Sequence, residues 1–254
     1  MSYSIIIPAR YASTRLLGKP LLEIEGKPLI QHVYQRATET QAKRIIIATD
    51  DQRIADICNA FGAEVCLTRT DHQSGTERIA EVIKKLKFLD QEIVINLQGD
   101  EPDVPASLIE QTALCLQQNP MADMSTLATP IDNSTDLFNP NIVKVVLNEQ
   151  NLALYFSRAP IPWHRDQFPI LPNQTMPENH QWLRHIGLYG YRCGFLRQYI
   201  EWTISPLEQI ESLEQLRVLA HGGKIIVDIT QIQPAHGIDT KEDLEKARLA
   251  FKTK

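Results

Sequence analysis

Residues 44–50 read Arg44-Ile45-Ile46-Ile47-Ala48-Thr49-Asp50, an apolar run without the polar alternation of a half-exposed strand. A short β-branched run of this kind is typical of a strand that is buried on both faces. Similar runs lie at residues 5–7, 64–67 and 92–97, and helix-length amphipathic segments separate them. This alternation predicts an α/β fold, a three-layer α/β/α sandwich around a mostly parallel sheet.

The expected helices in this half of the chain are residues 29–37, 53–61, 76–86 and about 107–118. Gly62 follows the second of these segments directly. Because glycine readily adopts the left-handed conformation that ends many helices, Gly62 is predicted to be the C′ residue of that helix.

The pattern changes after about residue 120. Residues 143–147 and 152–156 flank Asn148-Glu149-Gln150-Asn151 and predict a small hairpin. A Pro-rich excursion follows, and we expect it to be ordered but mobile. The chain then returns with predicted strands at residues 186–191 and 224–229 and a final helix from Lys241.

Composition narrows the class of protein. The 254 residues hold 26 Lys plus Arg and 31 Asp plus Glu, and this net charge of −5 argues against a broad nucleic-acid footprint. A hydrophobic content of 43% is typical of a folded soluble domain. We therefore expect one domain over residues 1–254, no nucleic-acid partner and no membrane insertion.

The four cysteines are scattered, without a C-x-x-C pair. This is typical of buried thiols in a reducing compartment. Residues 1–8 form a short apolar run without a basic region before it, so they predict a strand and not a signal peptide. A cytoplasmic location is the expectation.

Ligands of open α/β sheets bind beyond the carboxyl ends of the strands. The loop after the first strand holds Arg10, Arg15 and Lys19 together with hydroxyl side chains such as Ser13, and it holds no acid. Such a loop can hold a polyphosphate, although it lacks the spacing of a Walker A loop. A solvated basic loop is the alternative.

Two carboxylates also follow predicted strands. Asp100 comes after residues 92–97, and Asp239 precedes the final helix. Both are suited to Mg²⁺, which prefers a few protein oxygens together with substrate phosphates. Alternatively, Asp100 caps the next helix, and Thr240 with Asp243 forms a capping box that leaves the carboxylate of Asp239 free.

Two further groups are less specific. The loop at residues 71–78 contains Ser74 and can read the edge of a nucleobase, while a helix cap at Thr76 is its structural alternative. A late group of arginines, histidines and acids suits an acidic substrate, although exposed arginines are common. Its members include Arg158, His164, Arg165, Arg184, His185, Tyr189, Glu208 and Glu211.

Seven motifs in this order resemble those of the 3-deoxy-manno-octulosonate (KDO) cytidylyltransferase family, the CMP-KDO synthetases, from Ser4 to about Arg248. The motifs are residues 6–16, 71–78, 96–102, 138–141, 155–158, 183–187 and 237–240. Where the family reads Arg-Leu-Pro-Gly-Lys-Pro, this chain has Leu17 in place of the proline, which loosens the backbone of the basic loop.

The resemblance implies a nucleotide-diphosphosugar-transferase-like fold, Mg²⁺ as cofactor, CTP and KDO as substrates, and a homodimer. It implies a nucleotide-binding part over about 1–120 and a sugar-binding and dimerisation part over about 121–235. Catalysis would use Lys19, Asp100 and Asp239, the two acids also binding the metal. The nucleotide would contact Arg10, Ser13, Arg15, Lys19, Ser74 and Gln98. KDO would contact Gln98, Arg158, Arg165, His185, Tyr189 and Glu211.

Three alternatives remain open on the sequence. A glycosyltransferase on the same kind of fold would consume a preformed sugar nucleotide and release no pyrophosphate. A non-enzymatic nucleotide-binding module would have no use for the two acids. An amino-substituted relative of KDO is not distinguished from KDO. We also expect residues 160–177 to cover the sugar site with Arg165, unless this segment is a dimer contact or a passive excursion.

Overall fold

The computed structural model describes residues 2–12, 16–166, 168, 176–177, 180–235 and 237–252. The chain divides into two compact units, each made of separate stretches of sequence. The first unit comprises Met1–Leu114, Leu188–Ile200 and Pro234–Lys254, and the second comprises Cys115–Gly187 and Glu201–Gln233. The helix α4 (Ala106–Gln118) and the strand β10 (Trp182–Arg192) contribute residues to both.

The first unit contains a mixed, mostly parallel sheet in the strand order β10-β6-β1-β4-β5. β1 is parallel to β4 and β6, with Ile6 opposite Ile46 and Asn96, while the last part of β10 is antiparallel to β6. The strands are β1 (Tyr3–Ala9), β4 (Arg44–Thr49), β5 (Glu64–Leu67) and β6 (Ile93–Asn96).

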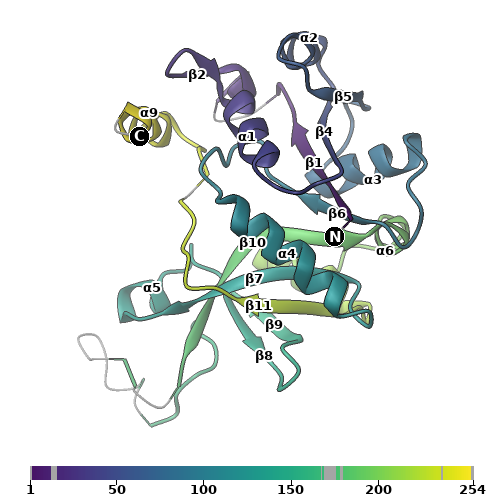
Figure 1. The fold of residues 1–254 in the computed structure, drawn as a ribbon. Coiled ribbons are helices and arrows are strands. Elements are labelled where there is room, and N and C mark those ends of the chain that lie inside the picture. The colour runs from purple at the N-terminus through teal and green to yellow at the C-terminus, as the bar shows by residue number, and fades with distance from the viewer. Residues whose placement is uncertain are drawn as a thin grey trace. The chain divides into compact units, whose positions relative to one another are not determined.

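Helices cover this sheet, as the ribbon shows (Figure 1). Five consecutive residues of β1 are buried, so both faces of the strand are covered. These helices are α1 (Leu29–Thr38), α2 (Gln52–Ala60), α3 (Gly75–Lys85) and α6 (Cys193–Tyr199). The unit also contains the helix α9 (Lys241–Lys252) and a short 3₁₀ turn η1 (Lys19–Leu21). The predicted three-layer α/β/α arrangement with a mostly parallel sheet is confirmed.

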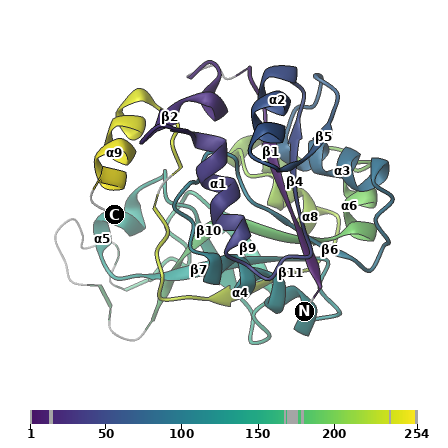
Figure 2. The ribbon, with the colours of Figure 1, turned by 45° about the horizontal axis from the view of Figure 1, so that its top comes forward.

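A small hairpin of β2 (Glu23–Ile24) and β3 (Lys27–Pro28) lies beside the C-terminal helix α9, as both ribbon views show (Figures 1 and 2). An apolar cluster holds the two elements together. Its buried members are Leu16, Ile24, Leu29, Ile238 and Leu244. The end of the basic loop and the segment before α9 therefore share one apolar core.

The second unit contains β7 (Met124–Ile131), α5 (Ser134–Phe138), β8 (Lys144–Leu147), β9 (Ala153–Ser157), α7 (Pro206–Glu211), α8 (Gln215–Ala220) and β11 (Ile225–Ile229). β11 is parallel to β7, and β8 is antiparallel to both β9 and the first part of β10. The predicted hairpin is confirmed. Its turn is held by Asn148, whose Oδ1 accepts hydrogen bonds from the main-chain N–H groups of Gln150 and Leu152.

Two local predictions near helix ends have different outcomes. Gly62 has a φ of +84°, and its N–H donates to Asn59 O, so its place just after α2 is confirmed. The alternative interpretation of the loop at residues 71–78, a helix cap at Thr76, is wrong about the residue. Ser74 caps α3, because its Oγ accepts a hydrogen bond from Glu77 N, while Thr76 lies inside the helix.

All four cysteines are buried and unpaired, as expected. Among the described residues, no helix combines the length and the apolar character needed to cross a bilayer.

Candidate active site

The basic loop after β1 returns to the sheet through Gly18 and Lys19. The N–H of Gly18 donates to Tyr11 O at 3.0 Å, which closes the base of the loop. Gly18 has a φ of +67°, a conformation that favours glycine, and it begins the turn η1. This turn places the side chain of Lys19 in a mostly buried position, with 15% of it exposed.

Lys19 brings the two predicted metal-binding acids together. Its ammonium lies 2.6 Å from Asp100 Oδ2 and 3.2 Å from Asp239 Oδ1, and it also donates to the carbonyl of Ile238. Asp100 follows β6, and Asp239 lies just before α9 in a different stretch of the same unit. The structure therefore joins all three predicted catalytic residues in one cluster.

Two backbone features fix this cluster. A Cβ atom at Gly99 would lie 2.6 Å from Pro8 O, so the loop after β6 can approach the end of β1 only without a side chain. The N–H of Ile238 donates to Asp100 O at 2.9 Å. The positions of Asp100 and Asp239 are thus set by main-chain contacts and by Lys19.

Glu101 is the acid of this cluster that sequence reasoning did not single out. Burial, followed by the charges of Asp100 and Asp239, raises the pKa of its carboxyl from 4.5 to about 8, although Lys19 acts to lower it. One ammonium therefore lies among three carboxyl groups, and the pKa of Glu101 keeps that group mostly protonated at neutral pH. The adjacent acids in Asp100-Glu101 were the only sequence signal for this crowding.

The donor set fits a hard divalent cation. Asp100 and Asp239 supply carboxylate oxygens and are partly exposed, with 28% and 46% of their side chains accessible. The described residues contain no group of three His, Cys, Asp or Glu side chains arranged to hold a metal. Mg²⁺ is often bound in this way, by one or two carboxylates, with substrate phosphates completing its coordination.

The predicted capping box at the start of α9 is also present. Asp243 Oδ2 accepts from Thr240 N at 2.9 Å, and Thr240 Oγ1 accepts from Asp243 N at 3.2 Å. The capping role therefore belongs to Thr240 and Asp243, and the carboxylate of Asp239 faces Lys19.

Glutamates on α3 hold the loop at residues 69–74. Glu81 accepts hydrogen bonds from Arg69 N at 2.9 Å and from His72 Nε2 at 2.5 Å, and it pairs with Lys85. Burial acts to raise the pKa of Glu81, but the hydrogen bonds from Lys85, His72 and Arg69 outweigh it and lower the pKa to about 2.

The same loop ends beside the strand ends of the first unit. A Cβ atom on Gly75 would lie 3.3 Å from the Pro8 ring and 3.9 Å from Gln98 Oε1. Ser74 precedes Gly75, so the predicted nucleotide residues Ser74 and Gln98 belong to segments that pack together. Arg10 follows β1 and is exposed. Ser13 and Arg15 lie outside the described residues.

A second polar cluster lies in the second unit, at the end of β9. The carboxylate of Glu211 accepts hydrogen bonds from Ser157 Oγ at 2.6 Å and from Arg158 N at 3.0 Å. Arg158 Nε donates to Glu211 O, and its Nη1 donates to Pro140 O. The predicted substrate residues Arg158 and Glu211 are therefore in direct contact.

His185 lies on β10 in the same unit. Thr126 Oγ1 donates to Ile186 O, so it accepts from His185 Nε2, which lies 3.0 Å away and carries the ring hydrogen. Burial lowers the pKa of His185 to about 3, and the ring is neutral at physiological pH.

The remaining predicted substrate residues have different surroundings. Tyr189 lies on the part of β10 that belongs to the first unit, opposite Asn96, and it is partly buried. Arg165 is 96% exposed and lies 3.9 Å from Asp166. Most of the Pro-rich stretch after it is outside the described residues, so the expected cover over the sugar site stays a prediction. Glu208 forms a buried, bidentate ion pair with Arg217 and has a structural role.

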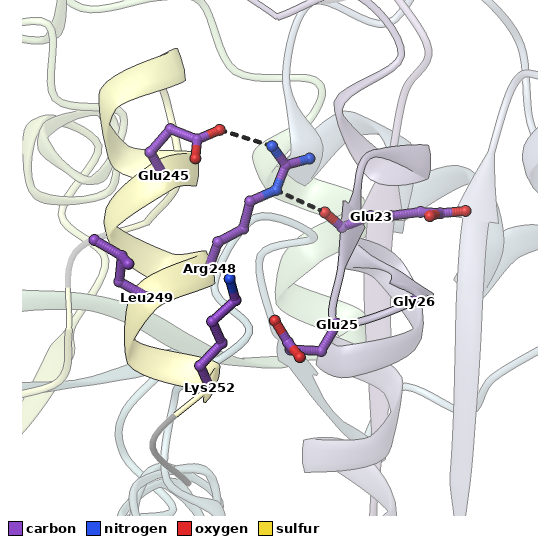
Figure 3. Close-up of a pocket in the computed structure, with 7 residues that line it drawn as sticks. All are labelled: Glu23, Glu25, Gly26, Glu245, Arg248, Leu249 and Lys252. Carbon is purple, nitrogen blue, oxygen red and sulfur yellow. Dashed lines mark hydrogen bonds and ion pairs between the residues drawn. The ribbon is translucent and has the colours of Figure 1, made fainter.

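A surface pocket of about 440 Å³ lies between the small hairpin and α9 (Figure 3). Arg248 donates from Nε to Glu23 O and from Nη1 to Glu245 Oε1, and so ties α9 to β2. None of the residues that line the pocket is a predicted site residue. They are Glu23, Glu25, Gly26, Glu245, Arg248, Leu249 and Lys252.

Carboxylates and a lysine that converge at the strand ends of an α/β/α sandwich are typical of enzymes that bind nucleotides with a metal ion. The sequence matches the cytidylyltransferase family over residues 4–226. The chain belongs to this family and is a nucleotidyltransferase.

Solved structures agree with this assignment. A CMP:2-keto-3-deoxy-manno-octonic acid synthetase in complex with CTP is 41% identical, with a TM-score of 0.89, over 99% of this chain and 98% of its own. A cytidylyltransferase from Leptospira borgpetersenii serovar Hardjo-bovis is 15% identical over 100% and 87%, with a TM-score of 0.63. HddC from Yersinia pseudotuberculosis is 16% identical over 98% and 99%, with a TM-score of 0.64. The last two share the fold.

Proposed function

We propose that this chain is a CMP-KDO synthetase, which converts CTP and KDO into CMP-KDO and pyrophosphate. The observation that carries the proposal is the 41% identity, over 99% of the chain, to a synthetase that uses the same sugar acid. The Lys19, Asp100 and Asp239 cluster supports it, because such a cluster suits a triphosphate bound with a metal ion.

In the proposed reaction, the anomeric hydroxyl of KDO attacks the α-phosphorus of CTP in line. The new bond joins this oxygen to phosphorus, the bond from phosphorus to the β-phosphate oxygen breaks, and pyrophosphate leaves. The hydroxyl proton passes to solvent water. Lys19 and Arg10, with Ser13 and Arg15 outside the described residues, would bind the triphosphate and neutralise its charge.

Mg²⁺ is part of the proposal. Asp100 and Asp239 would hold it, and when bound it would neutralise charge on the phosphates and polarise the attacking oxygen. Lys19 contacts both acids. We propose that Lys19 orients the two carboxylates and, because its three donors are already used, exchanges one of these contacts for a phosphate oxygen when CTP binds.

The nucleoside and the sugar acid would be bound by different groups. Ser74 and Gln98, which lie on packed segments of the first unit, would contact the nucleoside, and Gln98 also the sugar. Arginine side chains suit a sugar carboxylate because they form charge-assisted hydrogen bonds. Contacts to KDO are proposed for Arg158, Arg165, His185, Tyr189 and Glu211.

The proposed enzyme is a cytoplasmic homodimer. Four buried thiols and a CTP substrate support the compartment. Exposed apolar side chains at Ile204, Leu207 and Ile210 support self-association, since a monomer leaves these groups in water. Light scattering after size-exclusion chromatography measures the mass, and a monomer at micromolar concentration contradicts the dimer.

The experiment that tests the function measures pyrophosphate release with each of the four nucleoside triphosphates. Each reaction is run with KDO, with an amino-substituted relative of KDO, and without a sugar acid. The proposal expects release only with CTP and KDO. A preference for the amino-substituted sugar would show that this sugar, and not KDO, is the substrate. If no combination of nucleoside triphosphate and sugar acid releases pyrophosphate, the proposal is wrong.

A further inference from the structure

Lys144, at the start of β8, is a lysine with an exposed fraction of 0%. Lysine is rarely buried completely, because removing an ammonium from water is costly unless the protein replaces the lost hydrogen bonds. An apolar side chain of similar length would fill the same space at lower cost. The position of this cation therefore needs an explanation beyond packing.

All three hydrogens of the ammonium are used on main-chain carbonyl groups. Lys144 Nζ donates to Asn139 O at 3.0 Å, to Ile142 O at 2.7 Å and to Arg158 O at 2.6 Å. An ammonium has three donors, so this set is complete. Lys144 thus joins the segment at residues 139–142 to the residue that follows β9.

The same two segments meet a second time through Arg158. Its Nη1 donates to Pro140 O at 3.0 Å, between the two carbonyls that Lys144 holds. Its main-chain N–H and its Nε contact Glu211. Lys144, the 139–142 segment and Arg158 therefore form a closed ring of hydrogen bonds, which fixes both the main chain and the guanidinium of Arg158.

We propose that Lys144 is a positioning residue that orients the guanidinium of Arg158 toward the carboxylate of the sugar acid. The inference rests on the proposed function, which assigns Arg158 to that substrate. Lys144 itself touches no reacting atom. Its three hydrogen bonds to carbonyl groups stabilise the ring. If the ring were displaced, the guanidinium of Arg158 would no longer point toward the substrate carboxylate.

A double-mutant cycle tests this coupling. Lys144→Met is expected to raise the KM for KDO about tenfold and to leave the KM for CTP within about twofold. In an Arg158→Ala background the same change is expected to raise the KM for KDO less than twofold, because the group that Lys144 orients is gone. A repeated tenfold effect in that background overturns the proposal, as does an equal rise for CTP.

Two further variants separate positioning from stability. Lys144→Gln keeps amide donors without the charge, and its KM for KDO is expected to lie between those of the wild type and Lys144→Met. Ile225→Ala removes buried volume from the same unit without touching the ring, so it should lower the unfolding temperature without changing the KM for KDO. If neither Lys144 variant folds, Lys144 is a structural residue and the proposal is wrong.

A different result would contradict the proposed function itself. An unchanged KM for KDO in Arg158→Ala contradicts the substrate assignment of Arg158. A raised KM in Arg158→Ala together with an unchanged KM in Lys144→Met contradicts only the role of Lys144.

Discussion

The ammonium of Lys19 lies 2.6 Å from the carboxylate of Asp100, which is 81 positions further along the chain. The lysine therefore contacts an acid and, in the proposed function, also a phosphate of CTP, so its removal is expected to weaken the binding of CTP. We predict that Lys19→Ala raises the KM for CTP by roughly 10–100-fold, from the loss of a charge-assisted contact of about 1.5–3 kcal/mol. The KM for KDO should stay within about twofold. A defect confined to KDO contradicts the assignment.

The acids should be essential without being needed for folding. Asp100→Asn and Asp239→Asn are each predicted to abolish turnover, because losing one hard oxygen charge removes several kcal/mol of transition-state stabilisation. Asp243→Asn is the matched control, since Asp243 caps α9. It should lower the stability by about 1 kcal/mol and keep the activity. Near-normal turnover of Asp239→Asn at low Mg²⁺ would show that Asp239 does not bind the metal.

Alanine substitutions at Gly99, which follows β6, and at Gly187 should have different effects on kcat. Gly99→Ala would place a Cβ atom 2.6 Å from Pro8 O, so the main chain before Asp100 must move. A shift of about 1 Å at a catalytic group can cost roughly a hundredfold, and we predict a fall of that size in kcat. Gly187→Ala is the control, because no atom lies within 4 Å of its added Cβ. Similar kcat values for the two variants would refute the prediction.

Glu81 should stabilise the protein above acidic pH. Its pKa is lowered from 4.5 to about 2, so the folded protein releases a proton that the unfolded chain still binds within that window. The stabilisation is present above about pH 4.5 and is lost as the pH falls toward 2. Glu81→Gln is predicted to lose on the order of 1–3 kcal/mol at pH 7 and little near pH 2. Urea denaturation at both values measures this, and an equal loss at both contradicts it.

His185 should not titrate in the physiological range. Its pKa is lowered by burial from 6.5 to about 3, so the folded protein keeps the ring neutral where the unfolded chain binds a proton. Stability should therefore fall as the pH drops below 6.5, by at most about 1.4 kcal/mol per unit from this group. Nuclear magnetic resonance of the ring carbons should show no midpoint between pH 5 and 8. A midpoint near 6.5 would be the contrary result.

Local rules predicted the parts of the fold that depend on neighbouring residues. Gly62 ends α2, Thr240 and Asp243 cap α9, and Asn148 turns the hairpin, because each depends on contacts within a few positions. The convergence of Asp100 and Asp239 followed from the rule that ligands bind beyond strand ends.

Other features depended on tertiary contacts. β7 was not predicted, because Ser125, Thr126 and Thr129 interrupt its apolar pattern, although all three are buried. Thr126 can be buried because its hydroxyl donates a hydrogen bond to Ile186 O, 60 positions away. The burial of Lys144 could not be predicted either, since one of its partners is the carbonyl of Arg158.

The first unit is assembled from three separate stretches, and the proposed catalytic cluster of Lys19, Asp100 and Asp239 takes one residue from near each end of the chain and one from between. Lys19 and Asp239 are 220 positions apart. Contacts between residues so distant in sequence close slowly, since much of the intervening chain must already be ordered. In refolding, catalytic activity should therefore return with the slowest kinetic phase, later than the secondary structure, and so report when the contact between Lys19 and Asp239 has closed.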